Sequence, residues 1–254
     1  MRSGIDFDEE NYVNPYSDIA DLYMSKNVME LLEEVRFKHT PGTLHYYSSL
    51  DTEILTLILE RATGMSLSQY LEEKIFTPLG MESHGTWTLD SKKANNTKGF
   101  CCLNLTARDY AKLARLYLHG GTWNGVQVID ATWMDKSTTP DFENNCYQNQ
   151  WFSNVSWKFK ENSLGRYAAY QDSLSAQKDI TDAKHQKVMR SGHQKNEWMI
   201  KNCGPAFYAL GIFGQEVYVD PEDEMIFIRL GKKWDTSSPT IFKLIQRELR
   251  RQRR

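Results

Sequence analysis

The sequence predicts an α+β fold, and three observations lead to this. Amphipathic helical patterns dominate the first half of the chain, a β-hairpin and a final helix occupy its end, and no internal repeat divides it. The 254 residues are 40% hydrophobic and 25% charged, which is enough to bury the core of one large domain. We expect a mostly helical region over about 1–140 and a sheet region over about 150–254, within a single domain.

Helices are predicted where apolar residues recur at helical spacing between capping signals. The start is loop-like and acid-rich up to Asp21. Beyond it, Gly64 is placed to end one helix in a left-handed cap, and the motifs 66–69 and 106–109 have capping-box spacing. The expected helices cover 28–35, 50–64, 67–77, 107–119 and 129–137.

The second half of the chain changes to strand-like sequence. Apolar residues from Trp151 to Trp157 indicate a strand, whereas 158–201 is polar with little periodicity and resembles a surface insertion. The segments 216–220 and 225–230 flank a turn and predict a β-hairpin. A final helix, started by Ser238-Pro239, can cover the sheet with Ile241, Leu244 and Ile245.

Charge and cysteine content argue against several functional classes. With 31 basic and 33 acidic residues, the net charge of −2 gives no electrostatic case for nucleic acid, and the basic end 247–254 is typical of a helix terminus. Cys101, Cys102, Cys146 and Cys203 form no C-x-x-C pair and have no nearby histidine at ligand spacing, so we expect no metal and no cofactor. Adjacent Cys101 and Cys102 would point to opposite faces of a strand, so the sequence implies no disulfide framework. The sequence shows no membrane-spanning apolar run, and we expect no leader; compartment and oligomeric state stay open.

One stretch of the sequence carries the chemistry. Pro41-Gly-Thr-Leu-His-Tyr-Tyr-Ser-Ser49 leads into a helix ending in Thr63-Gly64, and Phe76-Thr-Pro-Leu-Gly-Met81 follows. This stretch resembles the serine β-lactamase and penicillin-binding-protein superfamily, within its class C-like esterase and 6-aminohexanoate-oligomer hydrolase branch. Residues 1–4, 103–121 and 211–221 match further segments in family order, and four matches in order are a strong signal.

The resemblance implies an antiparallel sheet flanked by helices, a helical region, and acyl-transfer chemistry in the cleft between them. In that family the serine of a Ser-x-x-Lys helix attacks a carbonyl, the lysine and a tyrosine carry its proton, and two backbone N–H groups hold the oxyanion. Tyr47 matches the catalytic tyrosine, and the alternative is a core tyrosine beside a turn. Ser49 stands where the family often has Asn and would line the active site, but a serine here is equally expected as a helix N-cap.

The third motif departs from the family pattern. Where the family has Lys-Thr-Gly or His-x-Gly, this chain has Ala209-Leu210-Gly211, with the backbone N–H of Ile212 as the implied oxyanion donor. The missing cation argues against carboxylate-bearing β-lactams and favours a small ester, amide or peptide-like substrate. The alternative is an ordinary hairpin strand that permits glycine.

The Ser-x-x-Lys segment of the family precedes its Met-x-Ser-Gly segment and so falls before residue 1. We therefore expect a serine hydrolase truncated at its N-terminus, without the first strand and the serine-bearing helix, marginally stable and nearly inert. The literal match Ser175-Ala-Gln-Lys178 lies in the polar insertion, on the wrong side of Tyr47 in family order.

Two alternatives stay open, a non-catalytic ligand-binding or scaffold protein of the same fold and an active enzyme that uses Ser175. Relatives are often exported, so the parent protein is expected to be periplasmic or membrane-associated.

Overall fold

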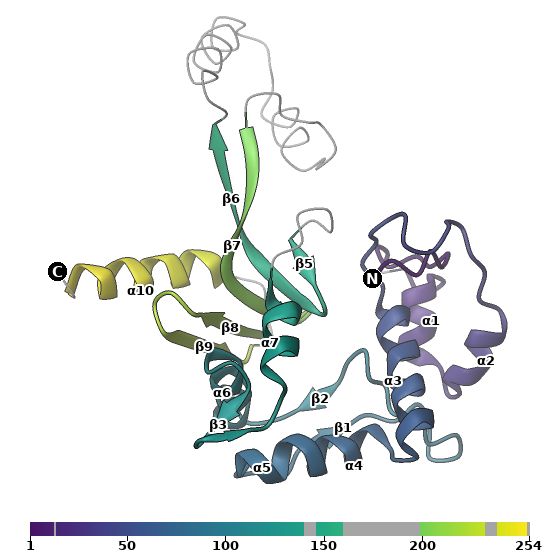
Figure 1. Ribbon diagram of the computed structural model, residues 1–254. Coiled ribbons are helices and arrows are strands. Elements are labelled where there is room, and N and C mark those ends of the chain that lie inside the picture. Colours follow the sequence, from purple (N-terminus) through teal and green to yellow (C-terminus); the bar gives the residue numbers. More distant parts are fainter. Residues whose placement is uncertain (13, 140–145, 160–198, 232–237, 253–254) are drawn as a thin grey trace, which may run out of the picture.

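A computed structural model describes residues 1–12, 14–139, 146–159, 199–231 and 238–252 (Figure 1). Helices dominate the first half, and one antiparallel sheet is built from the second half. This is the α+β organisation that the sequence predicts. In Figure 1 the helices of residues 18–79 lie to the right and below, and the large sheet lies to the left.

The helices of the first half have the bounds α1 Asp18–Met24, α2 Val28–Glu33, α3 Ser49–Thr63, α4 Leu67–Leu71, a π-helical turn Glu72–Phe76, α5 Thr77–Leu79, α6 Ala107–Leu118 and α7 Ala131–Thr138. Their ends confirm the capping signals. Gly64 ends α3 at φ 68°, in the left-handed conformation that glycine adopts without strain. Ser66 and Gln69 form the predicted capping box of α4, and Thr106 caps α6.

The helix α1 corrects the expectation of a loop up to Asp21. Ser17 caps it by accepting the backbone N–H of Ala20, and the side chains of Ile19 and Leu22 are fully buried. Two buried apolar residues within 7 are too few for helical periodicity to stand out among the acidic residues around them.

Five strands form one antiparallel sheet in the sequential order β5-β6-β7-β8-β9. Their bounds are β5 Tyr147–Gln148, β6 Trp151–Phe159, β7 Met199–Leu210, β8 Glu216–Asp220 and β9 Met225–Arg229. The predicted strand from Trp151 and the predicted β8–β9 hairpin are confirmed, and the hairpin pairs Glu216 with Arg229. Residues 160–198, the central part of the expected insertion, lie outside the described residues.

Two short hairpins complete the strands, β1 Thr86–Trp87 with β2 Leu103–Asn104 and β3 Thr122–Trp123 with β4 Val126–Gln127. The turn of the β3–β4 hairpin uses Asn124 at φ 49° and Gly125 at φ 83°. These left-handed residues are typical of a two-residue hairpin turn.

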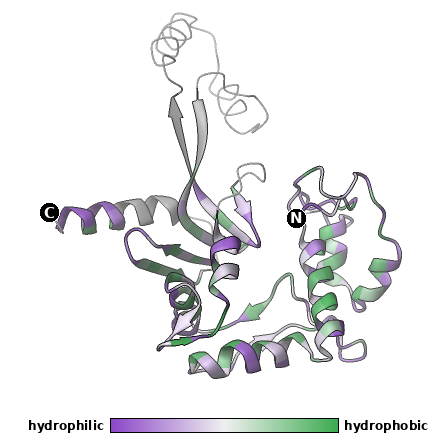
Figure 2. Cartoon of the chain, in the orientation of Figure 1, coloured by the Kyte–Doolittle hydropathy of each residue, from purple (hydrophilic) through white to green (hydrophobic). Residues whose placement is uncertain are grey.

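Hydrophobic clusters form both among the first helices and on the sheet. Ile19, Leu22, Val28 and Leu50 pack together between the first helices. On the sheet side, α6 contributes Ala114 to a cluster with Trp151, Phe207 and Val219. Figure 2 shows the same division, with apolar colouring on α1, β8 and β9 and hydrophilic colouring at the end of α10 (Ser238–Gln252).

The final helix α10 is attached to the sheet by polar contacts. Gln246 donates to Asp220 at 2.8 Å, and Arg250 pairs with Asp223 at 2.9 Å. Ile245 is 37% exposed, so it covers the sheet less than expected. The side chains of Ile241 and Leu244, which the sequence also predicts to cover the sheet, are not among the described ones. Neither α10 nor any other helix in the described ranges has the length and apolarity needed to cross a lipid bilayer.

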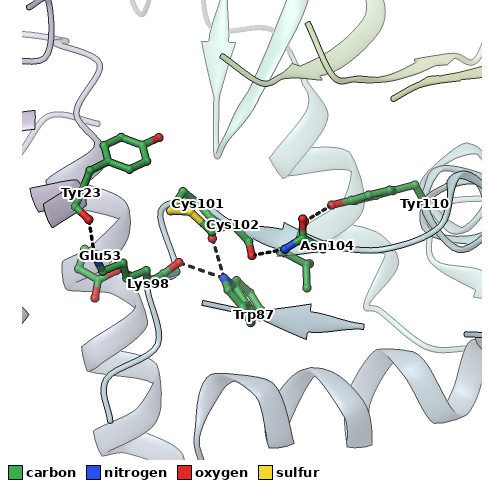
Figure 3. Close-up of a disulfide and its surroundings, with 10 residues drawn as sticks. Tyr23, Glu53, Trp87, Lys98, Cys101, Cys102, Asn104 and Tyr110 are labelled. Carbon is green, nitrogen blue, oxygen red and sulfur yellow. Dashed lines mark hydrogen bonds between the residues drawn. A yellow bond between two sulfur atoms is a disulfide. The ribbon is translucent and has the colours of Figure 1, made fainter. Parts of the chain in front are cut away.

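The structure pairs all four cysteines, so the expectation of no disulfide framework is wrong. Cys101 is bonded to Cys102 (Figure 3), and Cys146 is bonded to Cys203 across 57 residues. Neighbouring residues of a regular strand point to opposite faces, but Cys102 has φ 70°, a left-handed conformation that breaks this alternation. The second pair is joined by tertiary folding, which no spacing rule predicts.

A buried carboxylate joins α3 to the loop 98–100 (Figure 3). Glu53 is 0% exposed, and its Oε2 accepts the backbone N–H of Gly99 at 2.8 Å, whereas Oε1 has no hydrogen-bond partner among the described residues. Nearby, the buried Lys98 donates to the carbonyl of Tyr23. Burial raises the pKa of Glu53 to about 7, against the opposite effect of backbone N–H groups in the loop.

We expect Glu53→Gln to be more stable than the wild type near pH 8, by about 2 kcal/mol. Because the folded chain holds the Glu53 proton more tightly than the unfolded chain, the free energy of unfolding falls as the pH rises from 4.5 to about 7. Glutamine keeps an oxygen for the N–H of Gly99 and cannot ionise, so this part of the pH dependence disappears. Urea denaturation at a series of pH values measures it.

The matched control is Glu72→Gln, which removes a charge from an exposed side chain. It should leave the pH dependence of the free energy of unfolding unchanged. If the free energy of unfolding of Glu53→Gln depends on pH in the same way as that of the wild type, burial does not raise the pKa of Glu53 in the folded chain.

Candidate active site

Tyr47 lies in the turn that leads into α3. Gly42 begins this turn at φ 85°, and Ser48 ends it as the N-cap of α3. The Tyr47 side chain remains 38% exposed. Partial burial raises the pKa of Tyr47 to about 12, and the negative charge of Glu9 adds to the effect. The phenol is therefore protonated at neutral pH in this environment.

Three aromatic rings of the sheet, together with the ring of Tyr47, connect the turn to the sheet. The Tyr47 ring stacks on Phe152 of β6 with centroids 5.9 Å apart and planes 21° apart. Phe152 stacks in turn on Tyr208 of β7, at 5.6 Å and 20°. Tyr147 stands edge-on to both Tyr47 and Phe152, at 5.7 and 4.7 Å. We call these four residues the aromatic stack.

A polar contact lies beside the aromatic stack. Thr52, in the first turns of α3, donates through Oγ1 to Oε1 of Gln150 at 3.2 Å, and the hydroxyl of Tyr147 donates to the same oxygen at 2.8 Å. Gln150 adopts φ 74° in the tight turn between β5 and β6. The start of α3 is thus tied to this turn by two kinds of interaction.

Ser49 is buried beside Tyr47, but it is not the N-cap. The cap is Ser48, whose side chain accepts the backbone N–H of Asp51, so the N-cap interpretation of Ser49 is wrong. Ser49 instead directs its backbone N–H and its hydroxyl to the two carboxylate oxygens of Glu9, each at 2.7 Å. Sequence reasoning missed Glu9 because 40 residues separate it from Ser49 and no motif links them.

Residues 1–4 are built into the same region. The carbonyl of Gly4 accepts the backbone N–H of Lys38 at 2.8 Å. At φ 77°, a Cβ on Gly4 would lie 2.1 Å from the carbonyl oxygen of His39, so only glycine fits. Ser3 donates its hydroxyl to Asp51 of α3 at 2.6 Å. The Met-Arg-Ser-Gly segment therefore packs against both the Tyr47 turn and α3.

Gly211 and Ile212 lie in the turn between β7 and β8, although the sequence places them in a strand. The backbone N–H of Gly211 donates to the carbonyl of Gln215 at 2.8 Å, and the turn closes through Gly214 at φ 79°. Ile212 is 41% exposed. Gly211 follows Tyr208 by three residues along the chain, roughly 10 Å of strand. The aromatic stack therefore connects Tyr47 to the strand that leads to Gly211.

Comparison with known families identifies the family of this chain. A model of the Beta-lactamase family matches residues 1–246. The chain belongs to the β-lactamase family. The match confirms the resemblance drawn from the motifs around Tyr47 and identifies the fold as that of this hydrolase family.

The relatives of this β-lactamase-family chain include a 6-aminohexanoate-dimer hydrolase. The 6-aminohexanoate-dimer hydrolase of Paenarthrobacter ureafaciens is 26% identical over 176 residues, which cover 60% of this chain and 44% of that protein. The chain thus spans less than half the length of this curated relative.

Solved structures show the same fold. A Bacillus anthracis structure described as "Putative 6-aminohexanoate-dimer hydrolase" matches with a TM-score of 0.67 and 21% identity, covering 98% of this chain and 58% of that one. A β-lactamase from Mycobacterium bovis matches with a TM-score of 0.51 and 19% identity, covering 84% and 67%.

The sequence also predicts no metal site, and it leaves Ser175 open as an alternative nucleophile. Within the described ranges, no group of three or more His, Cys, Asp or Glu side chains is arranged to hold a metal ion. Ser175 and Lys178 lie outside the described residues. The site residues that the structure does bring together are Tyr47 and Ser49, with Glu9 and the aromatic stack around them.

The Cys146–Cys203 disulfide should be the main covalent support of this site. It joins the residue before Tyr147 to β7 and closes a loop of 57 residues, so Cys146→Ala/Cys203→Ala should lose about 2–4 kcal/mol of unfolding free energy. The control, Cys101→Ala/Cys102→Ala, should lose less because adjacent cysteines restrict the unfolded chain little. Thermal and urea denaturation of both double variants measures this. Equal losses would contradict the loop-closure argument.

Proposed function

We propose that this chain forms part of a serine hydrolase that cleaves ester, amide or peptide-like bonds by acyl transfer, with Tyr47 as its proton carrier. The observation that carries the proposal is the Tyr47 turn, which matches the family motif and packs through the aromatic stack against the strand leading to Gly211. The name of the 6-aminohexanoate-dimer hydrolase relative supports an amide or ester substrate.

In the proposed reaction a serine hydroxyl attacks the substrate carbonyl and loses its proton toward the tyrosine. Collapse of the tetrahedral intermediate expels the alcohol or amine, which takes up that proton, and water then releases the acyl group from the serine. The backbone N–H of Ile212 is the proposed donor to the oxyanion, and Ser49 is a proposed lining residue. No cation occupies the sequence Ala209-Leu210-Gly211, which favours substrates without a carboxylate at that point.

We also propose that residues 1–254 do not supply the nucleophile. The family-order Ser-x-x-Lys segment is absent from this sequence, and the environment of Tyr47 supports the same view. A phenol acts as a base where a neighbouring cation favours phenolate. The charge that acts on Tyr47 is instead the Glu9 carboxylate, which together with burial raises the Tyr47 pKa to about 12. In the proposed hydrolase the lysine of a Ser-x-x-Lys segment would be the required cation.

One observation favours a second candidate, a non-catalytic ligand-binding member of the family. The Tyr47 ring is 38% exposed and is held by stacking on Phe152, so it is available to contact a bound ligand. An in-frame Ser-x-x-Lys segment in the coding sequence upstream of Met1 would support the hydrolase, and its absence would support the binder.

We expect the 254-residue chain to form no covalent adduct with a fluorophosphonate probe and to hydrolyse a p-nitrophenyl ester no faster than a Ser175→Ala control. The physical reason is that the proposed hydrolase needs an activated serine, and we propose that residues 1–254 do not supply it. Intact-mass spectrometry and absorbance at the nitrophenolate band give the two readouts. An adduct on the wild type that disappears in Ser175→Ala would make Ser175 the nucleophile and overturn the proposal.

A further inference from the structure

Glu9 is a buried carboxylate on the inner side of the Tyr47 turn. It is 5% exposed, and its oxygens accept the backbone N–H and the hydroxyl of Ser49, each at 2.7 Å. The hydroxyl of Tyr12 donates to it as well. Burial of a carboxylate is costly unless donors surround it, and these three donors meet that requirement.

The backbone of Glu9 makes a further contact on the other side of Tyr47. Its N–H donates to the hydroxyl of Tyr46 at 3.3 Å. Glu9 therefore holds Tyr46 with its backbone and Ser49 with its side chain, and Tyr47 lies between them in the sequence. The N–H of Ser49 belongs to the first turn of α3, where it has no acceptor within the helix and where a negative charge is favourable.

We propose that Glu9 is the positioning residue for Tyr47, fixing the phenol in place by holding both sides of its turn. We call the contacts of Glu9 with Tyr46 and Ser49 the clamp. Its catalytic purpose rests on the proposed function, but the contacts themselves belong to the 254-residue chain. The charge of Glu9 supports the assignment. Burial is the largest cause of the raised Tyr47 pKa, and the Glu9 carboxylate is the second largest. The phenol is thereby kept protonated until a cation offsets Glu9.

Besides Glu9, three tyrosines and one histidine lie near Tyr47; the histidine is His45, whose ring contacts that of Tyr147 at 5.5 Å. Tyr12 and Tyr23 interact with it electrostatically, and Tyr147 contacts its ring. Glu9 is therefore the carboxylic acid whose charge acts on the Tyr47 phenol among the described residues. A change in the charge of Glu9 should be detectable directly at the phenol of residue 47.

The test replaces Tyr47 with 3-nitrotyrosine, whose phenol ionises near neutral pH and absorbs visible light only as phenolate. In this background Glu9→Gln should lower the midpoint of the absorbance titration by about half a pH unit or more, because it removes a nearby negative charge. Glu10→Gln, which removes the exposed charge of the next residue, is the matched control and should leave the midpoint unchanged. An unchanged midpoint in Glu9→Gln overturns the proposal.

A second measurement uses the wild type and covers the case in which Glu9→Gln does not fold. First-turn amides of a helix exchange rapidly with solvent unless an acceptor holds them. The Ser49 amide should therefore be protected in hydrogen exchange, and an unprotected Ser49 amide overturns the clamp. Neither experiment needs turnover. If the coding sequence upstream of Met1 held no Ser-x-x-Lys segment, the proposed hydrolase would be refuted, whereas a protected amide and a shifted midpoint would leave the clamp standing.

Discussion

The stacked rings of Tyr47, Phe152 and Tyr208 are the interaction on which the arrangement of the site depends. They come from the turn before α3, from β6 and from β7, and their centroids are 5.9 and 5.6 Å apart. Each such pair contributes about 0.5–1.5 kcal/mol beyond the area it buries. Because α3 begins directly after the turn and β7 is the middle strand of the sheet, the stack sets the position of the helical region against the sheet.

Two buried glutamates at α3 show how hydrogen bonding decides what a buried acid does. Glu9 meets three donors and therefore fits a structural role at the start of the helix. Glu53 lies further along the same helix, with one oxygen bonded to Gly99 and the other without a partner in the described residues. Burial then raises the pKa of Glu53 to about 7, so this carboxyl is only partly ionised near neutral pH.

Local features could be predicted from the sequence because their causes are local. The caps at Ser66 and Gly64, the β8–β9 hairpin and the Tyr47 turn all depend on residues a few positions apart, and the family motif added the chemistry. The missed features depend on tertiary contact. The pairs Glu9–Ser49 and Cys146–Cys203 are separated by 40 and 57 residues, distances over which spacing carries no signal.

The most direct test of whether this chain assembles the site is a double-mutant cycle between Tyr47 and Phe152, with Tyr47→Leu, Phe152→Leu and the double variant measured by urea denaturation. The stack predicts a coupling of about 1 kcal/mol in the free energy of unfolding. A cycle of Tyr47→Leu with Tyr110→Leu, in α6, should be additive. If the Tyr47 and Phe152 changes are also additive within about 0.3 kcal/mol, the turn does not pack on the sheet and the account of the site is wrong.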